Sequence, residues 1–153
     1  MRRQFAKDLY KLMAKDKDIV LIAIDLGYGM LDKIRDDYPD QFINPGAAEQ
    51  AAVTIAVGLA LSGKIPIVYS ITPFLLYRPF EVIRNYLDNE SIPVILVGGG
   101  RGQDYVHDGF SHDASDHEII KQFKNINFLV PENSFNLKEI VYSKKPTYLN
   151  LRR

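Results

Sequence analysis

The sequence contains the run Ile19-Val20-Leu21-Ile22-Ala23-Ile24, followed at once by Asp25-Leu26-Gly27. An apolar run of this length without polar alternation is typical of a strand whose two faces are both buried in a parallel sheet. Parallel strands need crossover connections, which are usually helices. The stretch therefore predicts a parallel sheet covered by helices, with Asp25 in the loop where the strand ends.

The same cycle of strand and helix repeats along the chain. Apolar runs predict strands over residues 19–24, 42–44, 65–70, 93–97, 128–130 and 147–151, and helical spacing predicts helices over 5–13, 48–61, 74–87, 116–123 and 135–142. Strands that alternate with helices indicate an α/β fold: an open, mostly parallel sheet with helices on both faces. Ligands of such sheets bind at the carboxyl ends of the strands.

The length of 153 residues favours one domain with a single core, so we expect one unit over 1–153. Its first part, 1–18, is expected to form an amphipathic helix, because Phe5, Leu9, Leu12 and Met13 recur at helical spacing.

Charge and cysteine content exclude several classes of function. Nineteen basic residues balance nineteen acidic ones, so we expect binding neither to nucleic acid nor to an anionic membrane. The chain has no cysteine, which removes disulfides, thiolate metal sites and cysteine nucleophiles and suits the cytoplasm. The longest apolar stretch, 51–61, falls short of the roughly 20 residues of a membrane span.

A carboxylate opens one of the predicted helices. Glu49 follows Asn44-Pro45-Gly46-Ala47-Ala48 and stands in the first turn of the apolar segment 51–61. Acidic residues favour this position because they complement the positive end of the helix dipole. A role in chemistry is the alternative, and the spacing alone leaves both interpretations open.

Two further motifs follow strands. The run 72–80 places Phe74, Tyr77 and Phe80 at spacings of three, which suits either core packing or a binding face. The segment 98–102, Gly-Gly-Gly-Arg-Gly, lacks the lysine and hydroxyl residue of a phosphate-binding P-loop. We interpret it as a mobile or tightly turning active-site loop, with backbone flexibility as the plain alternative.

All three histidines of the chain lie within residues 107–117. Their spacing matches no standard metal-ligand set, so acid–base chemistry or recognition of substrate hydroxyls is the better interpretation. A hydrolase triad built from Ser111 and His112 is disfavoured, because adjacent residues rarely align and no G-x-S-x-G elbow is present. Ser115 or Asp116 is expected to cap the next helix.

Several segments taken together resemble one family. They are Phe42-Ile43-Asn44-Pro45-Gly46-Ala47-Ala48-Glu49-Gln50, Gly63-Lys64-Ile65-Pro66-Ile67-Val68-Tyr69, Phe74, Arg78-Pro79-Phe80-Glu81-Val82-Ile83-Arg84-Asn85, Asp108-Gly109-Phe110-Ser111-His112 and Lys145-Pro146-Thr147-Tyr148-Leu149-Asn150-Leu151. In order and spacing they are similar to the central, pyrimidine-binding domain of transketolases, over about 19–153. Deoxyxylulose-phosphate synthases and the β subunits of 2-oxoacid dehydrogenases are more distantly similar.

The resemblance implies the cofactor thiamine diphosphate and a role for Glu49. That glutamate would hydrogen-bond N1′ of the cofactor's aminopyrimidine and favour the imino tautomer, whose nitrogen removes the thiazolium C2 proton. Cofactor contacts would also come from Phe74, Asp25 and Arg78, and from Ile71, which stands where the family usually has a second aromatic residue.

Substrate recognition is implied for two other residues. Asp108 and His112 match family positions that bind substrate hydroxyls and assist proton transfer. Phe110-Ser111 replaces the usual proline-threonine, which predicts a substrate that differs from the common sugar phosphates. The residues that bind substrate phosphate would come largely from another chain.

The sequence has no Gly-Asp-Gly followed about thirty residues later by asparagine, the family's diphosphate and magnesium motif, and it ends where a third domain would begin. We therefore expect no metal site in this chain and a separate partner chain that holds Mg²⁺, in an assembly of two copies of each.

The resemblance thus predicts a subunit of a split, transketolase-like enzyme that transfers a ketol unit or catalyses a related carboligation. A subunit of a 2-oxoacid decarboxylase or dehydrogenase is one alternative, and the substrate would be a sugar or a 2-oxoacid accordingly. A non-catalytic assembly subunit is another. A nucleotide-binding module at 98–102 is the weakest, because that loop lacks its companion acidic residue.

Overall fold

The computed structural model describes residues 1–113 and 117–153, with the backbone but not the side chains of 117 and 118. It contains a six-stranded sheet in the order β2-β1-β3-β4-β6-β5, and every neighbouring pair is parallel. The strands are β1 (Ile19–Ala23), β2 (Phe42–Ile43), β3 (Ile65–Ile71), β4 (Ile95–Gly99), β5 (Asn127–Leu129) and β6 (Thr147–Leu151). The predicted α/β class is confirmed.

The strand order reverses between β1 and β3. From β1 the chain moves outward to β2, and from β3 it moves the other way to β4. The loops on either side of such a switch point diverge and leave a crevice at the carboxyl edge of the sheet, which is where ligands of this architecture bind. The segments that follow β1, β2 and β3 therefore border the expected ligand position.

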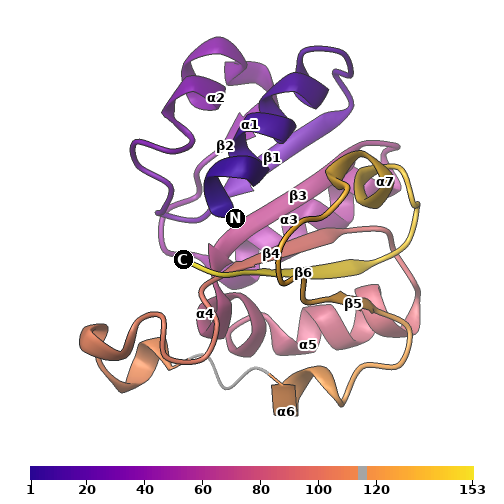
Figure 1. Ribbon diagram of the computed structural model, residues 1–153. Coiled ribbons are helices and arrows are strands. Elements are labelled where there is room, and N and C mark those ends of the chain that lie inside the picture. Colours follow the sequence, from indigo (N-terminus) through magenta and orange to yellow (C-terminus); the bar gives the residue numbers. More distant parts are fainter. Residues whose placement is uncertain (114–116) are drawn as a thin grey trace.

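One face of the sheet is covered by α1 (Arg2–Met13), α2 (Asp32–Asp37) and α7 (Leu137–Val141) (Figure 1). Phe5 and Leu9 of α1 are fully buried, and the Phe5 ring stacks on Tyr69 of β3 with centroids 5.9 Å apart. The helix forms because its apolar residues recur every three to four positions, and burial of that stripe against the strands holds it in place.

The other face carries α3 (Glu49–Leu61), α4 (Thr72–Tyr77), α5 (Phe80–Val82), the π-helix η2 (Ile83–Asn89) and α6 (His117–Ile120). Residues such as Ala52, Val53 and Ala56 of α3 are buried against Ile22 and Val68 of the central strands. Short 3-10 helices occupy η1 (Pro39–Gln41), η3 (Val106–Asp108) and η4 (Phe110–His112). Within the described residues, no helix is long and apolar enough to cross a membrane.

The helix predicted over 74–87 is wrong in its continuity. The structure ends α4 at Tyr77 and begins α5 at Phe80, so Arg78 and Pro79 separate two helical segments. Proline has no backbone N–H and its ring clashes with the preceding turn, which breaks a helix at this point. Arg78 therefore lies in the break between the two helical segments.

The interpretation of 98–102 as a loop is also wrong in part, because Gly98 and Gly99 form the buried end of β4. A Cβ atom on Gly98 would collide with the Tyr148 hydroxyl and with Thr72 Oγ1. Glycine at this position therefore serves close packing rather than flexibility. The short helix α2 has no counterpart in the sequence prediction, and the cap predicted at Ser115 or Asp116 lies outside the described residues.

Candidate functional site

Glu49 is the first residue of α3 and is almost completely buried, with 4% of its side chain exposed. The preceding Ala48 offers no side-chain cap. A buried carboxylate needs compensation. Glu49 receives it from the positive end of the helix and from Arg78, whose Nη1 donates to Oε1 at 2.7 Å.

Arg78 also contacts the aromatic residue of the predicted site. Its Cζ lies 3.9 Å from the centroid of the Phe74 ring, which is within the range of a cation–π contact. Phe74 projects from α4, and the helix break at Pro79 places the guanidinium between that ring and Glu49. The planar cation thus engages both groups that the sequence assigns to the aminopyrimidine.

His112 completes the cluster. The edge of its ring meets Phe74, with centroids 4.9 Å apart and an interplanar angle of 68°. Ser111 Oγ lies 3.1 Å from His112 Nδ1. The structure therefore brings together Glu49, Arg78, Phe74 and His112, which are distant in sequence.

Asp25 lies at the same edge of the sheet, with its backbone in the left-handed region at φ 45°. Its N–H donates to Asn44 Oδ1 at 3.3 Å, and the same oxygen accepts the Gly46 N–H at 3.0 Å. Asn44 thereby ties the loop after β1 to the loop that leads to Glu49. Strained backbone held by its surroundings is a feature of functional sites.

Two predicted residues stand apart from these contacts. Asp108 is exposed in η3, and its side chain joins none of the hydrogen bonds or ion pairs found among the described residues. Ile71 is half-buried at the end of β3, where it precedes α4. The structure thus places both near the carboxyl edge without a mutual contact.

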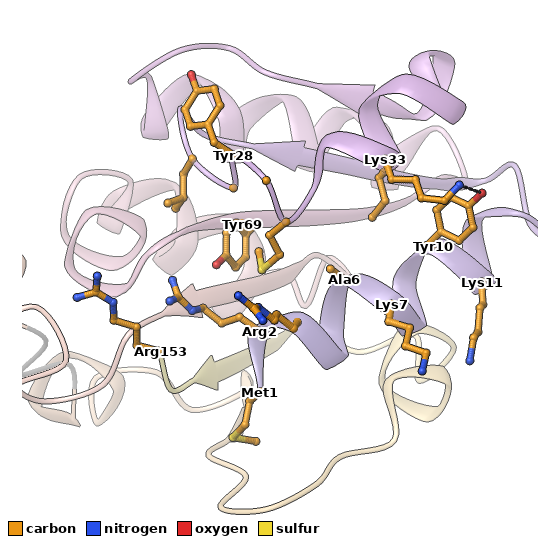
Figure 2. Close-up of a pocket in the computed structure, with 16 residues that line it drawn as sticks. Met1, Arg2, Ala6, Lys7, Tyr10, Lys11, Tyr28, Lys33, Tyr69 and Arg153 are labelled. Carbon is orange, nitrogen blue, oxygen red and sulfur yellow. Dashed lines mark hydrogen bonds between the residues drawn. The ribbon is translucent and has the colours of Figure 1, made fainter.

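A large basic pocket with a volume of about 1160 Å³ opens on the face of the sheet that α1 covers, which is opposite to the face that carries α3 and α4 (Figure 2). It lies between α1 and the loop after β1. Its lining includes six basic side chains: Arg2, Arg3, Lys7, Lys11, Lys33 and Arg153. Among the residues the structure describes, none of those lining it is acidic. Such a cavity attracts anions.

Tyr69 forms part of the pocket wall and is fully buried. Its hydroxyl is the one buried side-chain polar atom, among those described, without a hydrogen-bond partner. Burial raises the pKa of Tyr69, and the nearby Arg2 guanidinium opposes that shift in part. Figure 2 shows this hydroxyl on the side of the pocket where Arg2 and Arg153 lie.

The other end of the pocket is held by Lys33. Its Nζ donates to Asp37 Oδ2 at 2.6 Å and to the Tyr10 hydroxyl at 2.9 Å, and these two contacts raise the pKa of Lys33. The sequence prediction missed this pocket. A signal was present, because Arg3, Lys7 and Lys11 recur every four residues and must share one face of α1.

No group of three or more histidine, aspartate or glutamate side chains is arranged to hold a metal ion within the described parts of the chain. The residues linked to Glu49 instead offer groups that suit an organic ring: a buried carboxylate, an aromatic face and an imidazole, connected through Arg78 and Phe74.

Comparison with known families decides the relationship. The family model of the transketolase pyrimidine-binding domain matches residues 1–150. The chain belongs to this family.

Relatives of this pyrimidine-binding domain include the "Putative transketolase C-terminal section" of Methanocaldococcus jannaschii, 29% identical over all of this chain and 50% of the relative. One subunit of the apulose-4-phosphate transketolase of Phocaeicola vulgatus is 31% identical over 92% of the chain and 46% of its own length. A 1-deoxy-D-xylulose-5-phosphate synthase from Halothermothrix orenii is 29% identical, with 91% and 22% covered. The chain thus spans half or less of the curated relatives it matches.

Two solved transketolase structures have the same fold as this chain. A protein described as "Split gene transketolase, inactive beta4 tetramer" superposes with a TM-score of 0.85 at 27% identity, over 99% of this chain and 50% of that one. Transketolase from Pichia stipitis gives a TM-score of 0.82 at 18% identity, over 99% and 25% of the two chains, which shows the shared fold.

Proposed function

We propose that this pyrimidine-binding domain supplies one half of a thiamine-diphosphate site in a split, transketolase-like enzyme. The observation that carries the proposal is the buried Glu49 carboxylate, which is paired with the Arg78 guanidinium that also lies over the Phe74 ring. An acidic residue that only complements a helix dipole can stay in solvent, whereas a carboxylate that shares a proton with a ring nitrogen needs a dry site.

The residues at this site fit the aminopyrimidine. Glu49 would accept a hydrogen bond from the protonated ring nitrogen N1′, and Phe74 would pack on the ring face. Arg78 is 46% exposed on its side chain, so it can move from Glu49 toward solvent when a ligand arrives. The chemistry that the cofactor supplies when bound is nucleophilic addition to a carbonyl carbon and storage of the electron pair.

His112 and Asp108 would act on the substrate side. Because Ser111 engages His112 Nδ1, the Nε2 atom is left to exchange a proton with a substrate hydroxyl. Asp108 is exposed and is available to accept a hydrogen bond from a second hydroxyl. Asp25 and Ile71 would border the cofactor from the loop after β1 and from the end of β3.

The basic pocket favours a substrate that ends in a group with more than one negative charge. Of the six basic residues that line it, Lys33 is paired with Asp37, and the other five suit a phosphate ester better than a single carboxylate. This favours ketol transfer between sugar phosphates over 2-oxoacid chemistry, and under this proposal the phosphate would bind to this chain rather than to its partner. The names of two relatives, which contain apulose-4-phosphate and deoxyxylulose-5-phosphate, agree with that choice.

A separate partner chain would hold the diphosphate and Mg²⁺. The outer face of helix α3 leaves Ile55 and Leu61 exposed, and Ile55 lines a surface pocket together with Glu49 and Arg78. Phe110, in the same segment as His112, is a further apolar side chain that is 95% exposed. A partner that covers these residues would exclude water from the site. The solved relative described as an inactive beta4 tetramer supports the need for a second kind of subunit, and we propose two copies of each.

The test is calorimetry with thiamine diphosphate and Mg²⁺ on this chain combined with a diphosphate-domain chain from the same genome. The pair should bind the cofactor, and Glu49→Gln should weaken binding at least about tenfold, because a charge-assisted hydrogen bond is lost. Glu139→Gln is the matched control, since Glu139 lies in the first turn of α7 and is exposed. Absence of binding by the wild-type pair would overturn the proposal.

A further inference from the structure

A buried cluster of polar side chains lies where β3, β4 and β6 end. In the sheet register Ser70 pairs with Gly98, and Gly98 pairs with Asn150. Thr72 follows β3 directly and is fully buried, and Asn150 is 1% exposed. Polar side chains in such a position must satisfy one another, because water cannot reach them.

The cluster is built around one carbonyl group. Thr72 Oγ1 donates to the Gly100 carbonyl at 2.7 Å, and Asn150 Nδ2 donates to the same oxygen at 3.1 Å. The Tyr148 hydroxyl lies 3.3 Å from Thr72 Oγ1 and 3.1 Å from Asn150 Nδ2. Asn150 Oδ1 accepts from Arg101 Nε at 2.6 Å. These contacts fix the relative positions of three strand ends.

Two paths lead from this cluster to His112. On the first, Thr72 is the opening residue of α4, and Phe74 one half-turn later meets the His112 ring. On the second, Gly100 lies under Tyr105, so closely that a Cβ atom there would collide with the Tyr105 ring. The Tyr105 ring in turn lies 6.2 Å from His112. The cluster therefore holds both neighbours of that imidazole.

The two neighbours belong to segments that share no strand or helix. Helix α4 carries Phe74, and the loop after β4 carries Tyr105 and His112. The hydrogen bond from Thr72 to the Gly100 carbonyl joins the start of α4 directly to the start of that loop, so it contributes to their separation. A buried network in which every polar group is paired has one low-energy arrangement, so it restricts movement of the two segments relative to each other.

We propose that Thr72 and Asn150 are positioning residues for this site: their hydrogen bonds to the Gly100 carbonyl hold His112 against Phe74. An effect of these residues on catalysis rests on the proposed function. Their effect on the position of His112 does not. Neither side chain would touch the cofactor or the substrate.

Thr72→Val is the variant that tests it, because valine keeps the shape of threonine and removes only the hydroxyl. Thr72→Ser restores the hydroxyl and should restore wild-type behaviour. Thr147→Val is the matched control: Thr147 is also fully buried and its hydroxyl also donates to a carbonyl, that of Lys145, but it lies at the far end of β6.

The first readout is amide hydrogen exchange over 101–113 in the full chain. Thr72→Val should accelerate exchange there about tenfold, the effect of one lost buried hydrogen bond, whereas Thr72→Ser and Thr147→Val should stay within about twofold of wild type. The second readout is the NMR ring-current shift of the His112 protons caused by Phe74, which Thr72→Val alone should reduce.

Equal exchange in Thr72→Val and Thr147→Val, with an unchanged His112 shift, would overturn the positioning role. Neither readout needs activity, so failure of the proposed function would be seen separately, as a wild-type pair that transfers no ketol unit. In an active pair, Thr72→Val should lower kcat about tenfold with KM within about twofold, and Thr72→Ser should recover kcat.

Discussion

The Glu49 carboxylate and the Arg78 guanidinium form an ion pair of 2.7 Å in which one partner is buried and the other is half in solvent, with side-chain exposures of 4% and 46%. The buried partner depends on the pair, and the exposed partner is free to leave it. A ligand that neutralises Glu49 can therefore take the place of Arg78.

Removing Arg78 should destabilise the chain because Glu49 would keep its charge without a partner. Removing one member of a fully buried ion pair lowers the free energy of unfolding by about 3–5 kcal/mol. For Arg78→Met we expect about 1 kcal/mol in urea unfolding, because the exposed guanidinium is screened by water. The double variant with Glu49→Gln should recover most of the loss. Strictly additive effects of the two substitutions would contradict this coupling.

The surface ion pair Lys33–Asp37 is the control for that comparison of single and double variants. Its partners are four residues apart on α2 and both are largely exposed. We expect a much smaller coupling between these two residues from the same type of double-variant measurement, because water screens both charges.

We expect Asp25 to lower the stability of the fold and to contribute to cofactor binding. Its left-handed backbone, at φ 45°, is unfavourable for a residue with a Cβ atom. Asp25→Gly is expected to raise the free energy of unfolding by up to about 1 kcal/mol and to weaken cofactor binding by the partner-completed enzyme. Lys144, at φ 53° before β6, is the matched control. Lys144→Gly should stabilise similarly with binding unchanged, and equal cofactor affinity in both variants would argue against a role for Asp25.

The Tyr69 hydroxyl should likewise cost stability. It is buried without a hydrogen bond, so Tyr69→Phe should leave the free energy of unfolding unchanged or raise it by about 1 kcal/mol. Tyr148→Phe should lower it by about 1 kcal/mol, because that hydroxyl is hydrogen-bonded within a buried cluster. Chemical denaturation of the two variants gives the comparison, and a loss of stability in Tyr69→Phe would show that its hydroxyl has a partner.

Charge in the basic pocket should act on substrate affinity. Replacing Arg2 or Arg153 with glutamine is expected to raise KM for a ketose phosphate about tenfold with little change in kcat, more so at low ionic strength. Arg84→Gln is the control, since Arg84 is exposed on η2 away from the pocket. If both pocket variants match Arg84→Gln in steady-state kinetics, the phosphate does not bind there.

The parallel sheet was predictable because buried strands leave a direct trace in sequence. The run 19–24 is apolar without alternation, which only a strand covered on both faces explains at this length. Helix α2 left no such trace, because Ile34 is its one buried residue and the rest of the segment is charged. Local patterns detect elements that bury a face, and α2 buries almost none.

The site was predictable in part for a related reason. Glu49, Phe74 and His112 stand out through residue type and resemblance, but the burial of Glu49 depends on Arg78, which is distant in the chain and is redirected by Pro79. A glycine run usually indicates a loop, whereas Gly98 ends a buried strand and makes room for side chains from β6 and α4. Contacts between distant residues decide both features.

The most direct test of the central claim is exchange of the C2 proton of thiamine diphosphate bound to this chain and its partner, followed by NMR after quenching in D₂O. If Glu49 activates the cofactor, the Glu49→Gln pair should exchange that proton at least about 100-fold more slowly than wild type at saturating cofactor. Equal exchange rates in the two would contradict the account and leave Glu49 as a residue that only stabilises the start of α3.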